Sequence, residues 1–163
     1  MLVDLYLAGK LVIVIGGGTE GTRKVKSLLG QNCKIIVITN RLNKFLRDQA
    51  EKGKIDVVKT TLKDATRLDR FEKSYLVLAC TNDRLLNRKL VQKAKRIGAF
   101  AYAVDDPKVS DFSSVAITNI HDMMFVGIST KGKSPLMSRV FRKRIERSLK
   151  RYIQKEFPSE IKH

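Results

Sequence analysis

The chain has 163 residues, which fits one domain or one domain with a small appendage, and 43% of them are hydrophobic, which argues against a disordered protein. Its formal net charge of +17 is compatible with nucleic acid, an anionic membrane surface or an anionic small molecule as partner, or with a solvated surface alone. No apolar run reaches the roughly 18 residues that span a bilayer, and the N-terminus does not resemble a signal peptide, so we expect a soluble, cytoplasmic protein without a membrane partner.

The first two thirds of the chain alternate apolar runs with amphipathic segments. The runs are typical of strands buried on both faces, and they occupy residues 11–15, 34–38, 55–59, 74–80 and 99–104. Apolar residues at helical spacing lie between them, at 19–29, 41–53 and 82–98. Alternating strands and helices predict an α/β fold with a Rossmann-type parallel sheet and right-handed crossovers.

The pattern changes at about residue 113. Residues 114–118 and 123–129 resemble two strands joined by a hairpin turn at 119–122. A helix is predicted from about Leu136, and eleven basic residues follow from Lys131 to the end of the chain. The predicted helix also carries an apolar stripe, formed by Leu136, Val140, Phe141, Ile145, Leu149 and Ile153. We therefore expect two parts: residues 1–112, a nucleotide-binding domain, and residues 113–163, a small α+β segment.

Three glycines follow the first strand with the spacing G-x-G-x-x-G. They are Gly16, Gly18 and Gly21, with Gly17 between the first two. In a strand–turn–helix unit the first glycine permits a tight turn, the second lets the backbone approach a pyrophosphate, and the third lets helix and strand pack closely. The pattern therefore favours dinucleotide binding, and the alternative is a turn with a purely structural role.

The second strand ends without the acidic residue that usually accepts hydrogen bonds from the NAD ribose. Asn40 and Arg41 follow it instead. Asn40 is able to bond a ribose hydroxyl, whereas Arg41 has the charge to bind a 2′-phosphate or to remain a solvated surface group. The residues alone leave NAD and NADP both open.

Polar residues also follow the fourth and fifth strands. Thr81, Asn82 and Asp83 follow the fourth strand, and we expect at least one of them to line the cofactor site, with capping of the next helix as the alternative. Asp105 and Asp106 end the fifth strand, either as a turn or with one carboxylate acting as a general base beside the cofactor.

Cysteine and histidine are scarce. We expect Cys33 and Cys80 to be buried thiols that pack as small hydrophobic side chains. His121 falls in a predicted turn, where an exposed structural role is favoured over a titrating one. No segment shows metal-ligand spacing, so no metal site is expected.

Four segments together resemble a known family: "VIGGGTEGTRKVKSLL", "ACTNDRLLNRKLVQKAKRIG", "AVDDPKVSDF" and "GISTKGKSPLMSRVFRKRIE". They are similar to the precorrin-2 dehydrogenase family, which includes the N-terminal module of siroheme synthase. The resemblance implies oxidation of precorrin-2 to sirohydrochlorin with NAD as the hydride acceptor, in siroheme (porphyrin) biosynthesis. It also implies a homodimer whose second domain is built from both chains and, in some members, insertion of ferrous iron.

The resemblance also implies roles for individual residues. The family's NAD-contacting pairs fall on Thr19 and Glu20 and on Asn40 and Arg41, and its catalytic aspartate falls on Asp105. The basic loop and helix near the family's cleft suggest contacts to the carboxylates of the tetrapyrrole from Lys131, Lys133, Ser134 and Arg139, with a solvated helix face as the alternative for the basic residues. The positive charge of the chain would attract such a substrate.

Two other functions remain alternatives. A dinucleotide-sensing regulatory module would use the same fold and lack enzymatic activity. A nucleic-acid-binding protein would use the basic helix, but the chain has no Trp and no stacking platform of the RRM kind, so we do not expect nucleic acid as a partner.

Overall fold

The computed structural model describes residues 3–60, 63, 72–121 and 124–160. They form two compact units. The larger comprises Asp4–Phe112, and the smaller comprises the chain from Ser113 onward together with Val3.

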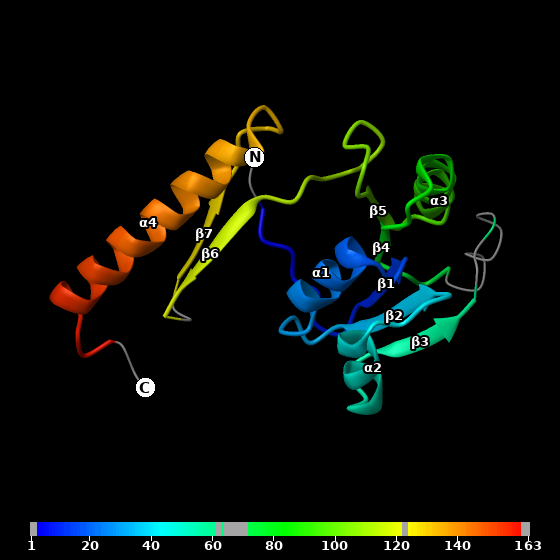
Figure 1. Cartoon of the computed structure of the whole chain (residues 1–163), viewed down its shortest axis with the longest axis horizontal. Helices are drawn as coiled ribbons and strands as arrows, with labels where there is room; N and C mark the ends of the chain where they lie inside the picture. Colours follow the sequence, from blue (N-terminus) through cyan, green and yellow to red (C-terminus); the bar gives the residue numbers. More distant parts are fainter. Residues whose placement is uncertain (1–2, 61–62, 64–71, 122–123, 161–163) are drawn as a thin grey trace. The chain divides into compact units, whose positions relative to one another are not determined.

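The larger unit is built on a five-stranded parallel sheet (Figure 1). Its strands are β1 (Leu11–Ile15), β2 (Lys34–Thr39), β3 (Asp56–Lys59), β4 (Leu76–Ala79) and β5 (Phe100–Ala103), in the order β3-β2-β1-β4-β5. The chain runs outward from β1 through β2 to β3 and then returns to place β4 on the other side of β1. This reversal opens a crevice at the carboxyl ends of β1 and β4, where ligands of such sheets bind. The predicted Rossmann-type parallel sheet is confirmed.

Helices cover both faces of this sheet. Alternate residues of β1 explain why: Val12 and Val14 pack in one core cluster with residues of α1 (Thr19–Leu28) and α2 (Lys44–Glu51). Ile13 and Ile15 pack in a second cluster with residues of α3 (Arg84–Arg96). Because β1 is covered on both sides, its sequence is an unbroken apolar run instead of an alternating one.

Helix capping explains why two helices begin later than the sequence predicted. The Asn43 side chain accepts a hydrogen bond from the Leu46 amide, so α2 begins at Lys44 and not at residue 41. The Asp83 carboxylate accepts one from the Leu86 amide, so α3 begins at Arg84. Each cap satisfies an amide that lacks an intrahelical partner.

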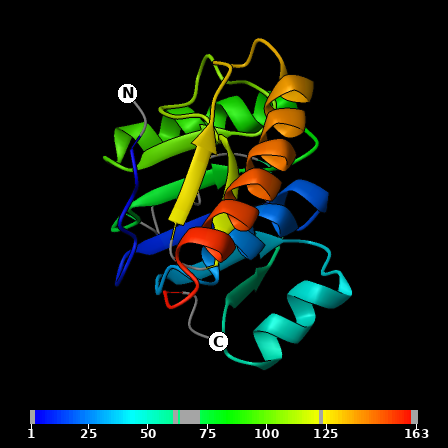
Figure 2. The same ribbon diagram turned by 90° about the vertical axis from the view of Figure 1, so that its left-hand side faces the viewer.

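The smaller unit is a β-hairpin with one long helix beside it (Figures 1 and 2). Strands β6 (Ala116–Ile120) and β7 (Met124–Ile128) pair antiparallel, and α4 (Pro135–Glu156) packs along β6. The predicted turn at 119–122 was placed too early, because Asn119 and Ile120 still belong to β6. Burial is the reason: Ile120 is fully buried and extends the strand. His121 lies exposed in a turn, as predicted, and residues 122–123 are outside the described residues.

The apolar stripe of α4 is only partly covered. Ile153 is buried, whereas Leu136, Val140 and Phe141 are 65%, 55% and 46% exposed. An exposed patch of large apolar side chains on a helix is unusual for a surface without a partner. Within the described residues, α4 and the shorter helices all lack the combination of length and hydropathy that spanning a membrane requires.

Candidate dinucleotide site

Three of the four clustered glycines are required by the protein's own packing. Gly16 has φ +108°, and a Cβ there would strike the backbone carbonyl of Cys80. A Cβ on Gly17 would lie 2.6 Å from Thr39 Oγ1, and one on Gly21 would strike the carbonyl oxygen of Gly16. The turn between β1 and α1 is therefore too tight for any side chain at these positions.

Gly18 is different. Its φ of −72° is open to any residue, and a Cβ there would have no protein atom within 4 Å. Gly18 is the N-cap of α1, and no side chain caps this helix end, so its first amides face the space beside the glycine. The fold itself gives no reason for a glycine here. A phosphate group that approaches the helix N-terminus closely would require a glycine at this position. The open space at Gly18 therefore fits a dinucleotide ligand.

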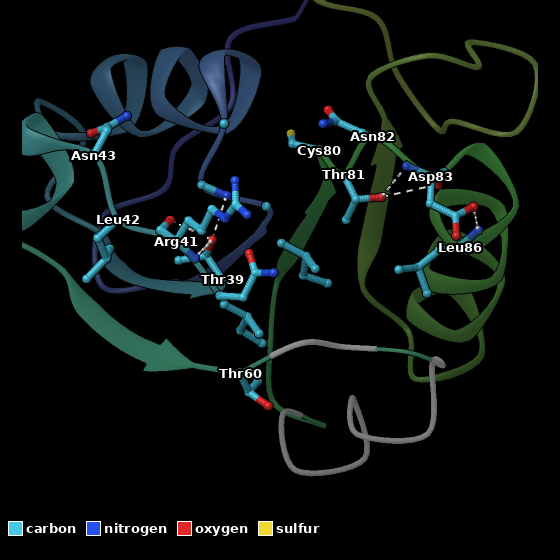
Figure 3. A pocket seen from close by; sticks show the side chains of 16 residues that line it. Thr39, Arg41, Leu42, Asn43, Thr60, Cys80, Thr81, Asn82, Asp83 and Leu86 are labelled. Atoms are coloured by element: carbon cyan, nitrogen blue, oxygen red, sulfur yellow. Dashed lines mark hydrogen bonds between the residues drawn. The ribbon is translucent and has the colours of Figure 1, made fainter.

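A pocket of about 680 Å³ lies in the crevice beside these glycines (Figure 3). This volume is within the range of small-molecule sites. Figure 3 shows Arg41 entering from the β2 side, opposite Thr81 and Asn82 on the β4 side. The predicted residues that line the pocket are Gly16, Gly17, Gly18, Asn40, Arg41, Thr81 and Asn82. Thr19 lines an adjoining recess with Arg23 and Lys26, while Glu20 pairs with Arg23 at 2.5 Å in the first turn of α1.

Thr39 holds the β2 side of the pocket together, a role that the sequence analysis missed. Its hydroxyl oxygen accepts hydrogen bonds from the amides of Gly17 (3.1 Å) and Arg41 (3.2 Å), and its hydroxyl donates to the carbonyl of Arg41 (2.9 Å). One buried side chain thus ties the glycine turn to the chain after β2. Asn40 and the side chain of Arg41 are left exposed at the pocket.

On the β4 side, capping and pocket lining are divided among neighbouring residues. Asp83 is the cap of α3, so the capping alternative is correct for this position. The Thr81 hydroxyl donates to Asn87 Oδ1 at 2.7 Å and accepts from the Asp83 amide at 3.1 Å. Asn82 is exposed and lines the pocket.

The two consecutive acids after β5 have separate environments. Asp106 is only 2% exposed; it accepts from Arg88 Nε at 2.8 Å, and Arg84 lies 3.7 Å away. The hydrogen bond from Arg88 holds the pKa of Asp106 below its usual value. Asp105 is exposed, and its Oδ1 accepts a hydrogen bond from the side-chain amide of Asn87 at 3.0 Å. Asp106 is thus committed to an internal ion pair, while Asp105 faces outward.

Two further titratable groups of the larger unit are buried. Cys80 lines the pocket, and burial raises the pKa of its thiol to about 12. Lys24 is 7% exposed with Nζ 3.9 Å from the centre of the Tyr102 ring, and burial lowers the pKa of this amine. The expectation of two buried thiols was wrong for Cys33, which is only partly buried and lies just before β2.

The residues expected to contact substrate lie in the smaller unit. Ser134 caps α4 by accepting a hydrogen bond from the Met137 amide at 3.2 Å. Lys131 has φ +52° in the loop before it, and Lys133 and Arg139 are exposed. Among the described residues, His, Cys, Asp and Glu side chains form no group of three able to hold a metal ion.

Known proteins resemble this chain in both sequence and structure. The NAD(P)-binding family model NAD_binding_7 matches residues 3–116. Siroheme synthase 1 of Aeromonas salmonicida is 33% identical over 147 residues, which are 90% of this chain and 30% of the relative. The siroheme synthase of Gluconacetobacter diazotrophicus is 35% identical over 147 residues, with 87% and 30% covered. The chain thus spans about 30% of the length of these curated relatives.

A solved structure, SirC, precorrin-2 dehydrogenase, matches with a TM-score of 0.75 and 21% identity, covering 94% of this chain and 75% of that chain. At this identity the match shows the fold. The strand order, the glycine turn and the pocket define a Rossmann-type dinucleotide-binding domain. The chain belongs to the NAD(P)-binding family NAD_binding_7, and its predicted resemblance to siroheme synthases is confirmed.

Proposed function

We propose that the chain is a precorrin-2 dehydrogenase, which oxidises precorrin-2 to sirohydrochlorin with NAD in siroheme biosynthesis. Similar proteins support the assignment, because the curated relatives are siroheme synthases and the matching structure is that of a precorrin-2 dehydrogenase. The observation that carries it is local. Gly18 leaves room for a phosphate at the N-terminus of α1. The side-chain amide of Asn87 links the exposed carboxylate of Asp105 to the pocket residue Thr81.

The reaction removes a hydride and a proton from the substrate, giving sirohydrochlorin, NADH and H⁺. NAD, when bound, supplies the hydride acceptor. The amides at the N-terminus of α1 would hold its pyrophosphate, with Thr19 and Glu20 in the same first turn, and Asn40 and Arg41 would contact the adenosine ribose. Asp105 takes the proton as a general base, and Asp106 is unsuited to this role because it is buried against Arg88.

The basic residues of the smaller unit bind the carboxylates of the substrate in this proposal. Lys131, Lys133 and Arg139 provide charge, and Ser134 provides a hydroxyl at the start of α4. Reversing the charge of Lys131 and Lys133 to Glu should raise KM for precorrin-2. The matched control reverses the charge of Lys52 and Lys54, two exposed residues. They precede the amino end of β3, whereas the pocket lies at the carboxyl ends of the strands. The same rise in KM in both variants would show a general effect of net charge and refute specific contacts.

We also propose a homodimer formed through the exposed part of the α4 stripe. Leu136, Val140 and Phe141 are large apolar residues that this unit leaves exposed. Covering them with a second copy removes apolar surface from water, which favours association. Sedimentation equilibrium should give a dimer for the wild type and a monomer for Phe141→Glu. A monomeric wild type would refute the proposal.

The assignment is tested by an anaerobic assay with enzymatically made precorrin-2 and NAD. NADH formation together with the sirohydrochlorin spectrum establishes the dehydrogenase, and Asp105→Asn should lower turnover by roughly 100-fold or more. Adding ferrous iron to the same reaction tests sirohydrochlorin ferrochelatase activity. Tight NAD binding without turnover would favour a non-enzymatic dinucleotide-sensing module instead.

A further inference from the structure

We propose that Asn87, on the first turns of α3, positions the Asp105 carboxylate relative to the cofactor pocket. The inference rests on the proposed function, since it gives Asp105 a role in the reaction. Asn87 is completely buried, although a polar side chain in a helix facing the core is unusual. Its burial therefore requires a reason in its hydrogen bonds.

Each polar atom of the Asn87 side chain is used. Its Oδ1 accepts from the Thr81 amide at 3.1 Å and from the Thr81 hydroxyl at 2.7 Å. Its Nδ2 donates to the Thr81 carbonyl at 3.0 Å and to Asp105 Oδ1 at 3.0 Å. The partners determine which end is oxygen, because a backbone amide needs an acceptor and a carboxylate needs a donor. One side chain thus links a residue of the pocket wall to the proposed base.

Helix formation and strand pairing do not require these bonds. Asp83 already caps α3, and the Asn87 backbone amide bonds to the Asp83 carbonyl as in any helix. The end of β5 is already held to β4, because the Val104 amide donates to the Ala79 carbonyl at 3.0 Å. The contact from Asn87 therefore orients the Asp105 carboxylate, and the surrounding fold does not depend on it.

The next residue of α3 makes the contrast clear. Arg88 binds the buried Asp106 through a charged pair at 2.7 Å, which neutralises that acid. Asn87 provides an uncharged donor to the exposed Asp105, so this contact orients the carboxylate and adds no opposite charge beside it. Arg88 thus pairs with Asp106 in an ion pair, whereas Asn87 makes a single hydrogen bond to Asp105. Of these two acids, Asp105 is the one that is available for chemistry.

Two substitutions of Asn87 test the acceptor and donor ends of its side-chain amide separately. Asn87→Leu keeps the approximate shape and removes all four hydrogen bonds, so both kcat and NAD affinity should fall. Asn87→Asp keeps acceptors for the Thr81 amide and hydroxyl but loses the donors to the Thr81 carbonyl and to Asp105, and it places a second carboxyl group beside Asp105. Because repulsion from the new carboxyl group turns Asp105 away from its wild-type direction, we expect kcat lower by roughly 10- to 100-fold and NAD Kd within about threefold of wild type.

Arg88→Met is the matched control on the same helix. It removes the partner of Asp106 and should lower the melting temperature at least as much as Asn87→Leu, with a smaller loss of kcat. A double mutant adds a second criterion: in an Asp105→Asn background, Asn87→Asp should lower kcat no further. Equal kcat for Asn87→Asp and wild type, or an unchanged effect in that background, would overturn the proposal.

A measurement without turnover keeps the two proposals distinguishable. In NMR spectra of the protein without cofactor, the side-chain amide protons of Asn87 should exchange slowly with solvent, and their signals should shift in Asp105→Ala. Absence of that shift overturns the positioning role. If the wild type fails to oxidise precorrin-2 but the shift is observed, the proposed function fails while the link between Asn87 and Asp105 stands.

Discussion

Replacing Gly18 with Ala should weaken dinucleotide binding while leaving the protein folded. The added methyl group has no protein atom within 4 Å, so it strains nothing in the chain itself. The residue is an N-cap, and Ala is a poorer N-cap than Gly, so the loss of stability should be about 1 kcal/mol or less. The same methyl group occupies the space through which a pyrophosphate reaches the helix amides.

The size of the binding effect follows from the bonds that would be lost. A hydrogen bond to a charged group contributes about 1.5 to 3 kcal/mol. Losing one such bond between the amides of α1 and a phosphate corresponds to roughly a 10- to 150-fold increase in Kd. The expected result is thus a large loss of affinity with a small change in stability.

Calorimetric titration with NAD and thermal unfolding of the same samples provide the test. Gly30→Ala is the matched control, because its methyl group also meets nothing within 4 Å, at the other end of α1. Gly21→Ala gives the opposite pattern: its methyl group strikes the Gly16 carbonyl, so it should destabilise the fold by roughly 1 to 3 kcal/mol. If Gly18→Ala binds NAD as tightly as Gly30→Ala does, the helix N-terminus is not the phosphate site.

Four further predictions concern single side chains. Burial lowers the pKa of Lys24, so stability should rise with pH between that lowered pKa and 10.5, and denaturant titrations should show this slope disappearing in Lys24→Met. The pKa of Asp106 is lowered, so its stabilisation is present above 3.8 and lost as pH falls through the lowered value; acid unfolding of Arg88→Met should show a weaker dependence. With a pKa of about 12, the buried Cys80 thiol should resist alkylation in the native protein, and mass spectrometry showing it modified as fast as in denaturant would contradict its burial. Because no acid follows β2, NADP should bind with an affinity within about tenfold of NAD, and Arg41→Ala should weaken NADP more than NAD in calorimetry.

The sequence alone determined the central sheet and the glycine turn. Both are local features, in which an unbroken apolar run marks a strand covered on two faces, and β1 occupies residues 11–15 as predicted. Helix starts were less accurate, since the predicted helices began at residues 41 and 82, ahead of the caps Asn43 and Asp83. The early placement of the hairpin turn had a similar cause, because the burial of Ile120 depends on packing beside α4.

Only the tertiary structure distinguished residues that look alike in the sequence. The adjacent acids Asp105 and Asp106 are equivalent in the sequence, and the pairing of β4 with β5 decides which of them meets Arg88. The same pairing brings Asn87 to Asp105, 18 positions away. Likewise, the four glycines form one motif, but only their surroundings show that Gly18 alone is open to a ligand. Periodicity reports which face of an element is buried, whereas the partner of a side chain depends on which elements the fold places next to it.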